Sequence, residues 1–339
     1  MIKQIVIGLL ALGVTLLCCE FFVRYSGIGM VSTSNFDPEI GKVNRTSLDF
    51  LMFNEGMGMG TFNEFGYLGK AYPKDRSPQT LRLALLGDSY VAGMQVMERH
   101  HFRSLLEDQL SEALKQKVEV LNFGMPGADL EDCYCVKENL VNGFAPDYYL
   151  FFVSAFDFFP KHTDPLSPKV SIENGKAIVD NNFPQAAIDR YESIQPYIQN
   201  SALVDMMRKG TKKTKSVPLA SILFDKVYTW FAPPVDMSES SEAYDFSSYP
   251  EIIPAMIGTL DPSQTIFVNR NKEPLPAELK ELLTDFPFID VSTVIAPRLD
   301  SVDSPISWPI TNRVGHWNLI GHQLVADQLT KELQPIIKQ

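Results

Sequence analysis

Short apolar runs and helical patterns alternate along most of the chain. Four runs are rich in Leu, Val and Phe, as expected for strands that are buried on both faces of a parallel sheet. They are residues 81–86 (LRLALL), 118–123 (VEVLNF), 147–154 (DYYLFFVS) and 264–269 (QTIFVN). Between and after these runs, apolar residues recur at the spacing of an amphipathic helix. These segments are residues 102–114, 129–143, 276–286 and 318–335. The alternation predicts an α/β fold with a central parallel sheet.

A longer apolar segment stands at the N-terminus. Residues 5–23 are apolar except for Glu20, and they have about the length of a membrane-spanning helix. A cleaved signal peptide or a lipoprotein site is the alternative, but the sequence LLCCE lacks the small residues that such a site requires. We therefore expect residues 1–24 to be an uncleaved anchor in a bacterial inner membrane. The positive-inside tendency places Lys3 in the cytoplasm and the main domain in the periplasm, although basic residues just after the segment oppose this orientation.

The rest of the chain divides into a lead-in and a main domain with an insertion. Residues 25–80 are mixed in character and are predicted to form a stalk together with strands that pack on the main domain. The main domain is predicted to span residues 81–337, and the alternating pattern is interrupted at about residues 160–260.

The insertion combines a hairpin pattern with helical patterns. Residues 170–179 (VSIENGKAIV) predict a hairpin with a type I′ turn at Asn174-Gly175. Residues 186–231 show helical patterns that we expect to break at Pro196 and Pro218. They predict either a helical subdomain with its own core or a lid over an apolar substrate.

Charge and motifs exclude several functional classes. The net charge of -11 argues against a nucleic-acid partner, because phosphate binding requires clustered Lys and Arg. The four cysteines form no disulfide framework, and no Cys or His pairs stand at metal-ligand spacing, so neither a metal nor a cofactor is predicted. A P-loop and a complete dinucleotide fingerprint are absent as well.

The sequence Gly87-Asp88-Ser89 follows the first predicted strand of the sheet. Ligands of an open parallel sheet bind beyond the carboxyl ends of its strands, so Ser89 is placed where a nucleophile would act. The alternative is an ordinary cap of the following helix. A serine nucleophile requires a base, and the chain has five histidines. Of these, His316 precedes the last helix in a loop that can return to the same edge of the sheet.

The other histidines are weaker candidates for that base. His100 and His101 begin the helix after Ser89 and are expected to face solvent. His322 falls within the last predicted helix and is expected to be structural.

Together these segments resemble the SGNH family of serine hydrolases, also called GDSL esterases and lipases. Residues 84–93 (ALLGDSYVAG), 119–127 (EVLNFGMPG) and the segment GHWNLIGHQLVADQL look like the family's first, second and last blocks. The resemblance implies a three-layer α/β/α sandwich of the flavodoxin-like type. It implies that Ser89 is the nucleophile, that His316 is the base, and that the N–H groups of Ser89 and Gly127 form the oxyanion hole.

Two positions depart from the family pattern. Phe156 stands where the third block usually has an asparagine that donates to the oxyanion. No acid stands two or three residues before His316, where the family places the residue that orients the histidine. Asp300, Asp303 and Asn312 are candidate substitutes, with Asp303 and Asp300 preferred; without any of them Ser89 and His316 would form a dyad.

The resemblance implies an esterase or acyl hydrolase acting on an acyl ester, with an O-acetylated glycan, a lipid or a small ester as substrate. O-acyl transfer by the same fold is an alternative, in which a sugar hydroxyl replaces water. A second alternative is a catalytically inactive member that binds a glycan or scaffolds a membrane complex. Protein partners are not predicted.

Overall fold

A five-stranded parallel sheet forms the centre of the protein. The structure is a computed structural model that describes residues 2–26, 29–53, 55–160, 164–213, 235–236, 245–246 and 248–338. The strands of the sheet are β5 (Leu81–Gly87), β6 (Val118–Gly124), β7 (Tyr148–Val153), β11 (Thr265–Asn269) and β12 (Phe288–Asp290). They lie side by side in the order β12-β11-β7-β5-β6 and all neighbours are parallel. Numbered along the chain, this is the 2-1-3-4-5 order of flavodoxin-like sheets, so the predicted fold class is confirmed.

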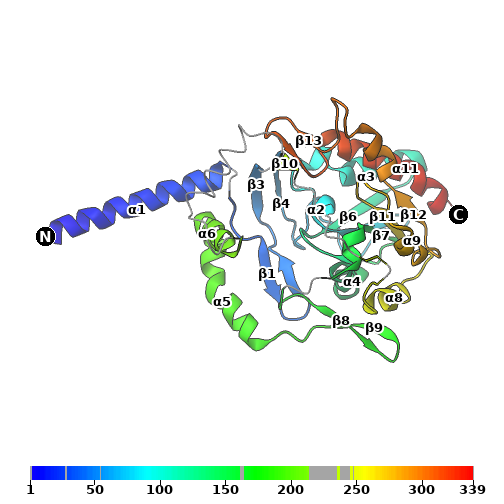
Figure 1. The fold of residues 1–339 in the computed structure, drawn as a ribbon, viewed down its shortest axis with the longest axis horizontal. Coiled ribbons are helices and arrows are strands. Elements are labelled where there is room, and N and C mark those ends of the chain that lie inside the picture. Colours follow the sequence, from blue (N-terminus) through cyan, green and yellow to red (C-terminus); the bar gives the residue numbers. More distant parts are fainter. Residues whose placement is uncertain are drawn as a thin grey trace.

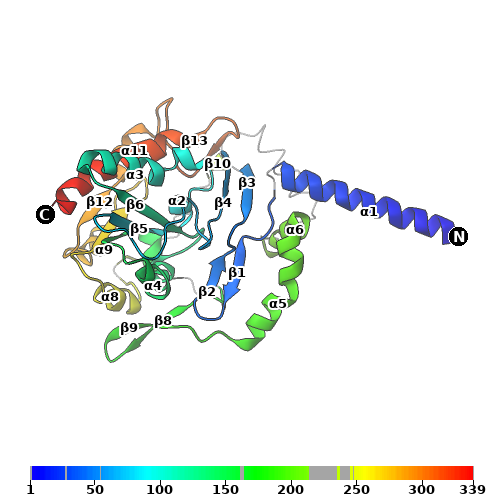
Figure 2. The same ribbon diagram turned by 180° about the vertical axis from the view of Figure 1, so that it is seen from behind.

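Helices cover both faces of this sheet (Figures 1 and 2). On one face, Leu83 and Leu85 of β5 pack against α3 (Phe102–Leu114), α10 (Ser292–Ile295) and α11 (Leu319–Ile337). On the other face, Ala84 and Leu86 pack against α4 (Leu130–Asn139), α8 (Ile252–Ile257) and α9 (Ala277–Glu281). Alternate residues of one strand thus enter two separate cores, which explains why the run 81–86 is apolar throughout most of its length.

The predicted elements match the observed ones with four differences. Helix α4 ends at Asn139 and a 3₁₀ turn follows it, instead of one helix continuing to residue 143. Helix α9 ends at Glu281 instead of continuing to residue 286. The edge strand β12 has three residues and was too short to be predicted from its pattern. The sequence predicted a helix break at Pro196, but this residue lies within α5 (Gln185–Asn200) and does not end it. This helix is largely exposed, so water can satisfy the carbonyl group that the proline leaves unbonded.

The lead-in forms two antiparallel hairpins. Strands β1 (Ser34–Asp37) and β2 (Gly41–Asn44) make the first hairpin, and β3 (Asp49–Phe53) and β4 (Met57–Thr61) make the second. Phe50 of β3 and the following Phe62 pack with Ala92 and Met94, which follow Ser89 in the chain. The second hairpin is therefore fixed against the segment that carries the candidate nucleophile.

The insertion contributes a hairpin and two helices to the described structure. Strands β8 (Lys169–Glu173) and β9 (Lys176–Asp180) are antiparallel, and Asn174 and Gly175 both have positive φ, as a type I′ turn requires. Helix α5 is followed by α6 (Ala202–Lys213). Pro218 and the aromatic residues Tyr228, Trp230 and Phe231, which belong to the predicted lid or subdomain, lie outside the described residues.

Short elements complete the described chain. Strands β10 (Val235–Asp236), β13 (Ser307–Trp308) and β14 (Arg313–Val314) form a small separate sheet. Helix α2 (Ser89–Ala92) and the 3₁₀ turns η1 (Glu98–His100), η2 (Val141–Phe144), η3 (Ala155–Phe158) and η4 (Ala296–Arg298) connect the larger elements.

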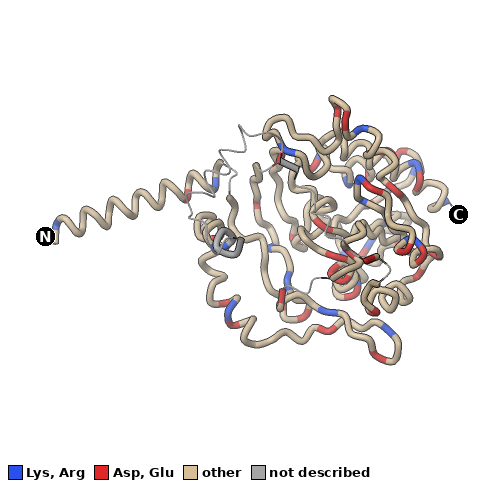
Figure 3. The backbone as a smooth tube through the Cα atoms, viewed as in Figure 1, with Lys and Arg blue, Asp and Glu red and all other residues tan. Residues whose placement is uncertain are grey.

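Helix α1 (Ile2–Tyr25) projects from the rest of the molecule (Figure 1). Its central part has no charged residue, and its charges stand near the two ends (Figure 3). The most apolar stretch of 18 residues in this helix has a mean hydropathy of 2.4, and none of that stretch is buried in the protein. The helix is long and apolar enough to cross a membrane, a property that an N-terminal signal sequence shares.

Candidate active site

Ser89 lies at the carboxyl end of β5, at the first residue of the short helix α2. Asp88 caps this helix, because its side chain accepts a hydrogen bond from the backbone N–H of Tyr90 at 2.9 Å. Gly93 ends the helix with φ 60°, and a Cβ atom there would lie 1.9 Å from Nε2 of His101. The glycine therefore serves two needs, a left-handed turn and a close approach of a buried ring.

His316 reaches Ser89 from the loop before α11. The distance from Ser89 Oγ to His316 Nε2 is 2.7 Å, a hydrogen bond between residues 227 positions apart. Trp308 Nε1–H donates to the carbonyl oxygen of His316 at 2.9 Å, and the ring of Tyr90 lies 4.6 Å from the imidazole ring. The structure thus brings together the two residues that the sequence singled out as nucleophile and base.

The other nitrogen of the imidazole faces a carboxylate that the sequence did not single out. Nδ1 of His316 lies 3.0 and 2.9 Å from the two carboxylate oxygens of Glu55, and the backbone N–H of His316 donates to Oε2 at 2.9 Å. Glu55 stands between β3 and β4 and is 4% exposed. With Nδ1–H donating to this carboxylate, Nε2 carries the lone pair that accepts the proton of Ser89.

Burial is the largest single influence on the pKa of Glu55 and would raise it, but several influences that lower the pKa together outweigh burial. Hydrogen bonds from His316, together with the charges of His316 and Arg313, hold the pKa of this carboxyl below its usual value. Glu55 is therefore ionised at neutral pH, the state that can stabilise an imidazolium at His316.

Two glycines allow close packing here, Gly315 against the Glu55 carboxylate and Gly56 against the Trp308 ring. A Cβ atom on Gly315 would lie 2.7 Å from the Glu55 carboxyl carbon, and a Cβ atom on Gly56 would lie 2.0 Å from the ring of Trp308. Close approach of backbone to a functional group is a setting in which only glycine fits.

The predicted orienting acids are not in this position. Asp300 and Asp303 are exposed on the surface, whereas the carboxylate in hydrogen-bond contact with His316 is that of Glu55. The prediction was restricted to residues near His316 in sequence, and the loop turns the imidazole toward the β3–β4 hairpin instead. A sequence-level signal for Glu55 is weak: it is one of 41 acidic residues, distinguished by its place beside a glycine after an apolar strand.

Of the other histidines that the structure describes, His100 is half-buried, whereas His101 and His322 are buried. His101 is buried, contrary to the expectation that it faces solvent, and its Nδ1 accepts a hydrogen bond from the backbone N–H of Arg103 at 3.0 Å. His322 is also buried and accepts from the backbone N–H of Phe102 at 3.2 Å. Burial lowers the pKa of His101 to about 3 and places that of His322 well below its ordinary value. His162 lies outside the described residues.

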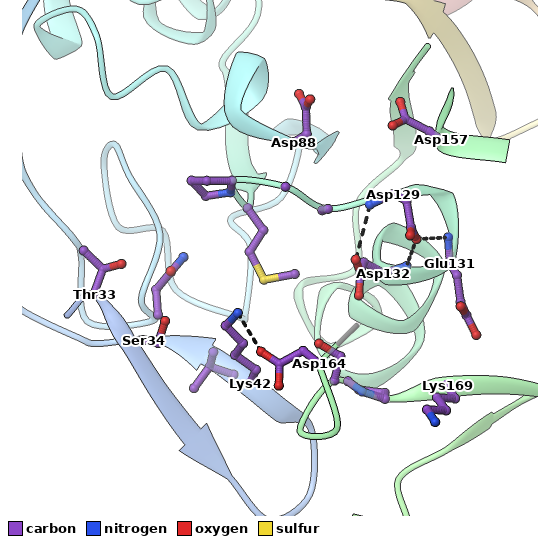
Figure 4. Close-up of a pocket in the computed structure, with 18 of the residues that line it drawn as sticks. Thr33, Ser34, Lys42, Asp88, Asp129, Glu131, Asp132, Asp157, Asp164 and Lys169 are labelled. Atoms are coloured by element: carbon purple, nitrogen blue, oxygen red, sulfur yellow. Dashed lines mark hydrogen bonds and ion pairs between the residues drawn. The ribbon is translucent and has the colours of Figure 1, made fainter. Parts of the chain in front are cut away.

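A polar cleft of about 280 Å³ is lined by Asp88, which directly precedes Ser89 in the chain, and by Gly127. It runs between the β1–β2 hairpin and the start of α4, and Figure 4 shows its charged residues. Most of its lining side chains are polar: Thr33, Ser34, Lys42, Asn44, Asp88, Asp129, Glu131, Asp132, Asp157, Asp164, Ser167 and Lys169. Lys42 Nζ pairs with Asp164 at 2.9 Å, and Asp129 caps α4. Phe156 and Phe159 add aromatic rings to the lining of the cleft.

Gly127, the residue predicted to supply an oxyanion-hole N–H, has two features that the structure describes. It lines the cleft together with Asp88, and its φ of 83° turns the backbone in a way that favours glycine. No described side chain or backbone atom would meet a Cβ atom there within 4 Å, so the space beside it is open.

Comparison with known proteins gives likenesses of fold only. No protein-family model and no curated protein matches the sequence. Solved structures with a similar arrangement include a two-domain esterase (CEX) active on acetylated mannans, at 14% identity and a TM-score of 0.38, with 77% of this chain and 50% of that chain covered. A lipase/acylhydrolase from Enterococcus faecalis has 14% identity and a TM-score of 0.36, with 75% of this chain and 96% of that chain covered. The psychrotrophic esterase EstA from a Pseudoalteromonas species has 12% identity and a TM-score of 0.37, with 76% of this chain and 99% of that chain covered. The chain spans half the length of the first of these proteins.

Proposed function

We propose that this protein is a membrane-anchored serine ester hydrolase. The observation that carries the proposal is the chain of contacts from Ser89 Oγ to His316 Nε2 and from His316 Nδ1 to Glu55. A serine, a histidine and a carboxylate in this order form the arrangement that activates a hydroxyl as a nucleophile.

In the proposed reaction, Ser89 Oγ attacks the carbonyl carbon of the ester while its proton passes to His316 Nε2. Glu55 stabilises the imidazolium that forms. The C–O bond to the alcohol then breaks, and the departing oxygen takes the proton from Nε2. Water attacks the resulting acyl-serine, again losing a proton to His316, and release of the acid regenerates Ser89.

The negative charge that develops on the carbonyl oxygen requires donors. We assign this role to the backbone N–H groups of Ser89 and Gly127, as the resemblance implies. Phe156 stands in the cleft wall where the family has its asparagine donor, so the site has one side-chain donor fewer than the family pattern. Loss of one such donor typically costs about 100-fold or more in rate.

The cleft favours a polar substrate over a long acyl chain. Twelve of its twenty lining residues carry a hydroxyl, amide or charged group, and a long alkyl chain would remove water from these groups without replacing their hydrogen bonds. We therefore propose a short acyl group, such as acetyl, on a hydroxyl-rich alcohol such as a glycan. Transfer of the acyl group to a sugar hydroxyl differs from hydrolysis only in the acceptor that enters the cleft.

The proposed location follows from α1. As an uncleaved anchor it would hold the main domain on the periplasmic side of a bacterial inner membrane, with Lys3 in the cytoplasm.

Labelling with a fluorophosphonate probe tests the proposal directly. The full chain in detergent micelles should be labelled at Ser89 and should hydrolyse p-nitrophenyl acetate, and both signals should vanish in Ser89→Ala. A folded wild-type protein that shows neither signal would contradict the hydrolase and would favour a binding protein of the same fold.

A further inference from the structure

A buried arginine links three segments around the candidate nucleophile. Arg270 directly follows β11, is 3% exposed, and its backbone N–H donates to the carbonyl of Val153 at the end of β7 at 2.9 Å. Strands β11, β7 and β5 are neighbours in the parallel sheet, so their carboxyl ends meet at one edge. Arg270 therefore belongs to the same edge as Ser89, although the two are far apart in sequence.

The guanidinium of Arg270 faces two carboxylates there. Its Nη2 lies 2.7 Å from Asp88 Oδ2 and 3.5 Å from Asp157 Oδ2, and it donates to the hydroxyl of Ser154 at 3.2 Å. Asp88 and Asp157 are 6% and 7% exposed, so water screens these charges poorly. Both acids also stabilise helix starts: Asp88 caps the turn that carries Ser89, and Asp157 accepts a hydrogen bond from the backbone N–H of Ser154, the N-cap residue of η3.

The arginine also contacts the aromatic wall of the site. Its guanidinium carbon lies 4.8 Å from the centre of the Tyr90 ring, and that ring lies 4.6 Å from the imidazole of His316. A guanidinium over an aromatic face is a stabilising contact, so Arg270 helps to hold Tyr90 between itself and the base.

Asp88 presents the site with an electrostatic difficulty. It precedes Ser89 in the chain and lines the same cleft as Gly127, whose N–H is the proposed oxyanion donor, so its carboxylate faces the space where the proposed reaction develops a negative charge. A buried like charge at that distance opposes the oxyanion. The asparagine donor that would offset such repulsion in the family is replaced by Phe156. The ion pair with Arg270 is the feature of the described structure that neutralises Asp88.

We propose that Arg270 is a positioning residue whose charge neutralises Asp88, so that Asp88 can cap the nucleophile's turn without opposing the oxyanion. This inference rests on the proposed ester hydrolysis. It gives Arg270 an electrostatic task that depends on Asp88, and not on substrate contact.

A double-mutant cycle on p-nitrophenyl acetate hydrolysis tests this task. Arg270→Met should lower kcat by about 100-fold, the effect of an unpaired buried charge several ångströms from the reacting atoms, while KM stays nearly constant. In the Asp88→Asn background, where the amide oxygen can still cap α2, the same Arg270→Met change should cost less than about tenfold. Arg270→Lys, which keeps the charge but loses the forked geometry, should fall between wild type and Arg270→Met. Lys280→Met removes a cation at the far edge of the sheet and should leave kcat unchanged.

The outcomes separate this inference from the proposed function. An equal cost of Arg270→Met in both backgrounds would overturn the electrostatic role and leave an ordinary structural one. If Arg270→Met alone does not fold, Arg270→Lys is compared in the two backgrounds, with the same expectation of a smaller cost in the Asp88→Asn background. A wild-type protein without Ser89-dependent activity would refute the hydrolase itself, which the probe labelling detects independently.

Discussion

Replacement of Glu55 by Gln is the most direct test of the contact that the sequence did not reveal. The amide has the size of the carboxylate, but one of its two ends donates hydrogen bonds where both oxygens of Glu55 now accept them. An amide N–H facing His316 Nδ1 favours the tautomer with hydrogen on Nε2. That tautomer cannot accept the proton of Ser89, to which Nε2 is hydrogen-bonded at 2.7 Å.

The expected loss can be estimated from the geometry and from a well-studied triad. Glu55 interacts with His316 through Nδ1 and through the backbone N–H, so it fixes both the tautomer and the position of the ring. The corresponding amide replacement in that triad lowers kcat by about 10⁴. We expect Glu55→Gln to lower kcat by about 10³- to 10⁴-fold, which is about 4 to 5.5 kcal/mol of transition-state stabilisation. KM should change by less than about threefold, because Glu55 is buried behind His316 and does not line the cleft.

The assay is initial-rate hydrolysis of p-nitrophenyl acetate by the full chain in detergent, together with the rate of fluorophosphonate labelling. Asp303→Asn is the matched control, since it removes an exposed carboxylate that the sequence had proposed for the same role. It should leave both rates within about twofold of wild type. A Glu55→Gln protein that melts like wild type and keeps more than about a tenth of its kcat would refute the orienting role of Glu55. A comparable loss of kcat in Asp303→Asn would also refute this role.

Three further predictions concern the geometry of the site and the stability of the fold that carries it. Gly315→Ala should lower kcat by at least about tenfold with a small change in KM, because its Cβ atom would press on the Glu55 carboxylate and shift His316, and steady-state kinetics measure this split. Arg82→Met should lower the free energy of unfolding by about 3 to 5 kcal/mol in chemical denaturation, because Arg82 is fully buried and pairs with the buried Glu119 at 2.6 Å. Stability should fall as the pH drops below about 6.5, because burial lowers the pKa of His101 to about 3 and the unfolded chain therefore takes up the proton first. The expected loss from this group is about 2 kcal/mol between about pH 6.5 and pH 4.5, and His101→Asn should reduce the slope of the denaturation midpoint against pH.

The parts of the fold that the sequence predicted are those with a local cause. Strand β5 is apolar at every position from Leu83 to Leu86 because both of its faces are buried, and such a run is visible without knowledge of its neighbours. The contact between Ser89 and His316 could be predicted because Ser89 follows that strand directly and few histidines compete with His316. Strand β12 was missed because three residues carry too little pattern to be separated from a loop.

The carboxylate was not predictable because its role depends on a contact between distant segments. Glu55 and His316 are 261 positions apart, and they meet where the β3–β4 hairpin packs beside helix α2. A search restricted to the neighbourhood of His316 therefore found only exposed acids. The misassignment of His101 has a similar cause: it adjoins His100 in sequence, and the turn η1 leaves His100 half-buried while it places His101 in the interior.

The lead-in therefore forms part of the candidate site. Contacts between α1 and the helices that support the lead-in also account for Glu20, the acidic residue within the apolar segment 5–23. The β1–β2 hairpin forms one wall of the cleft, and α5 holds it, with the Tyr191 hydroxyl donating to the carbonyl of Ser34 at 2.9 Å. Helix α6 follows α5, and its first backbone N–H groups, those of Ala202 and Leu203, donate to the Glu20 carboxylate at 2.9 Å. A carboxylate within an otherwise apolar helix is thus stabilised by the N-terminus of another helix. Because the same helices support the cleft wall, α1 and the proposed substrate site are connected through packed secondary structure, and a chain that began at residue 81 would lose both that wall and Glu55.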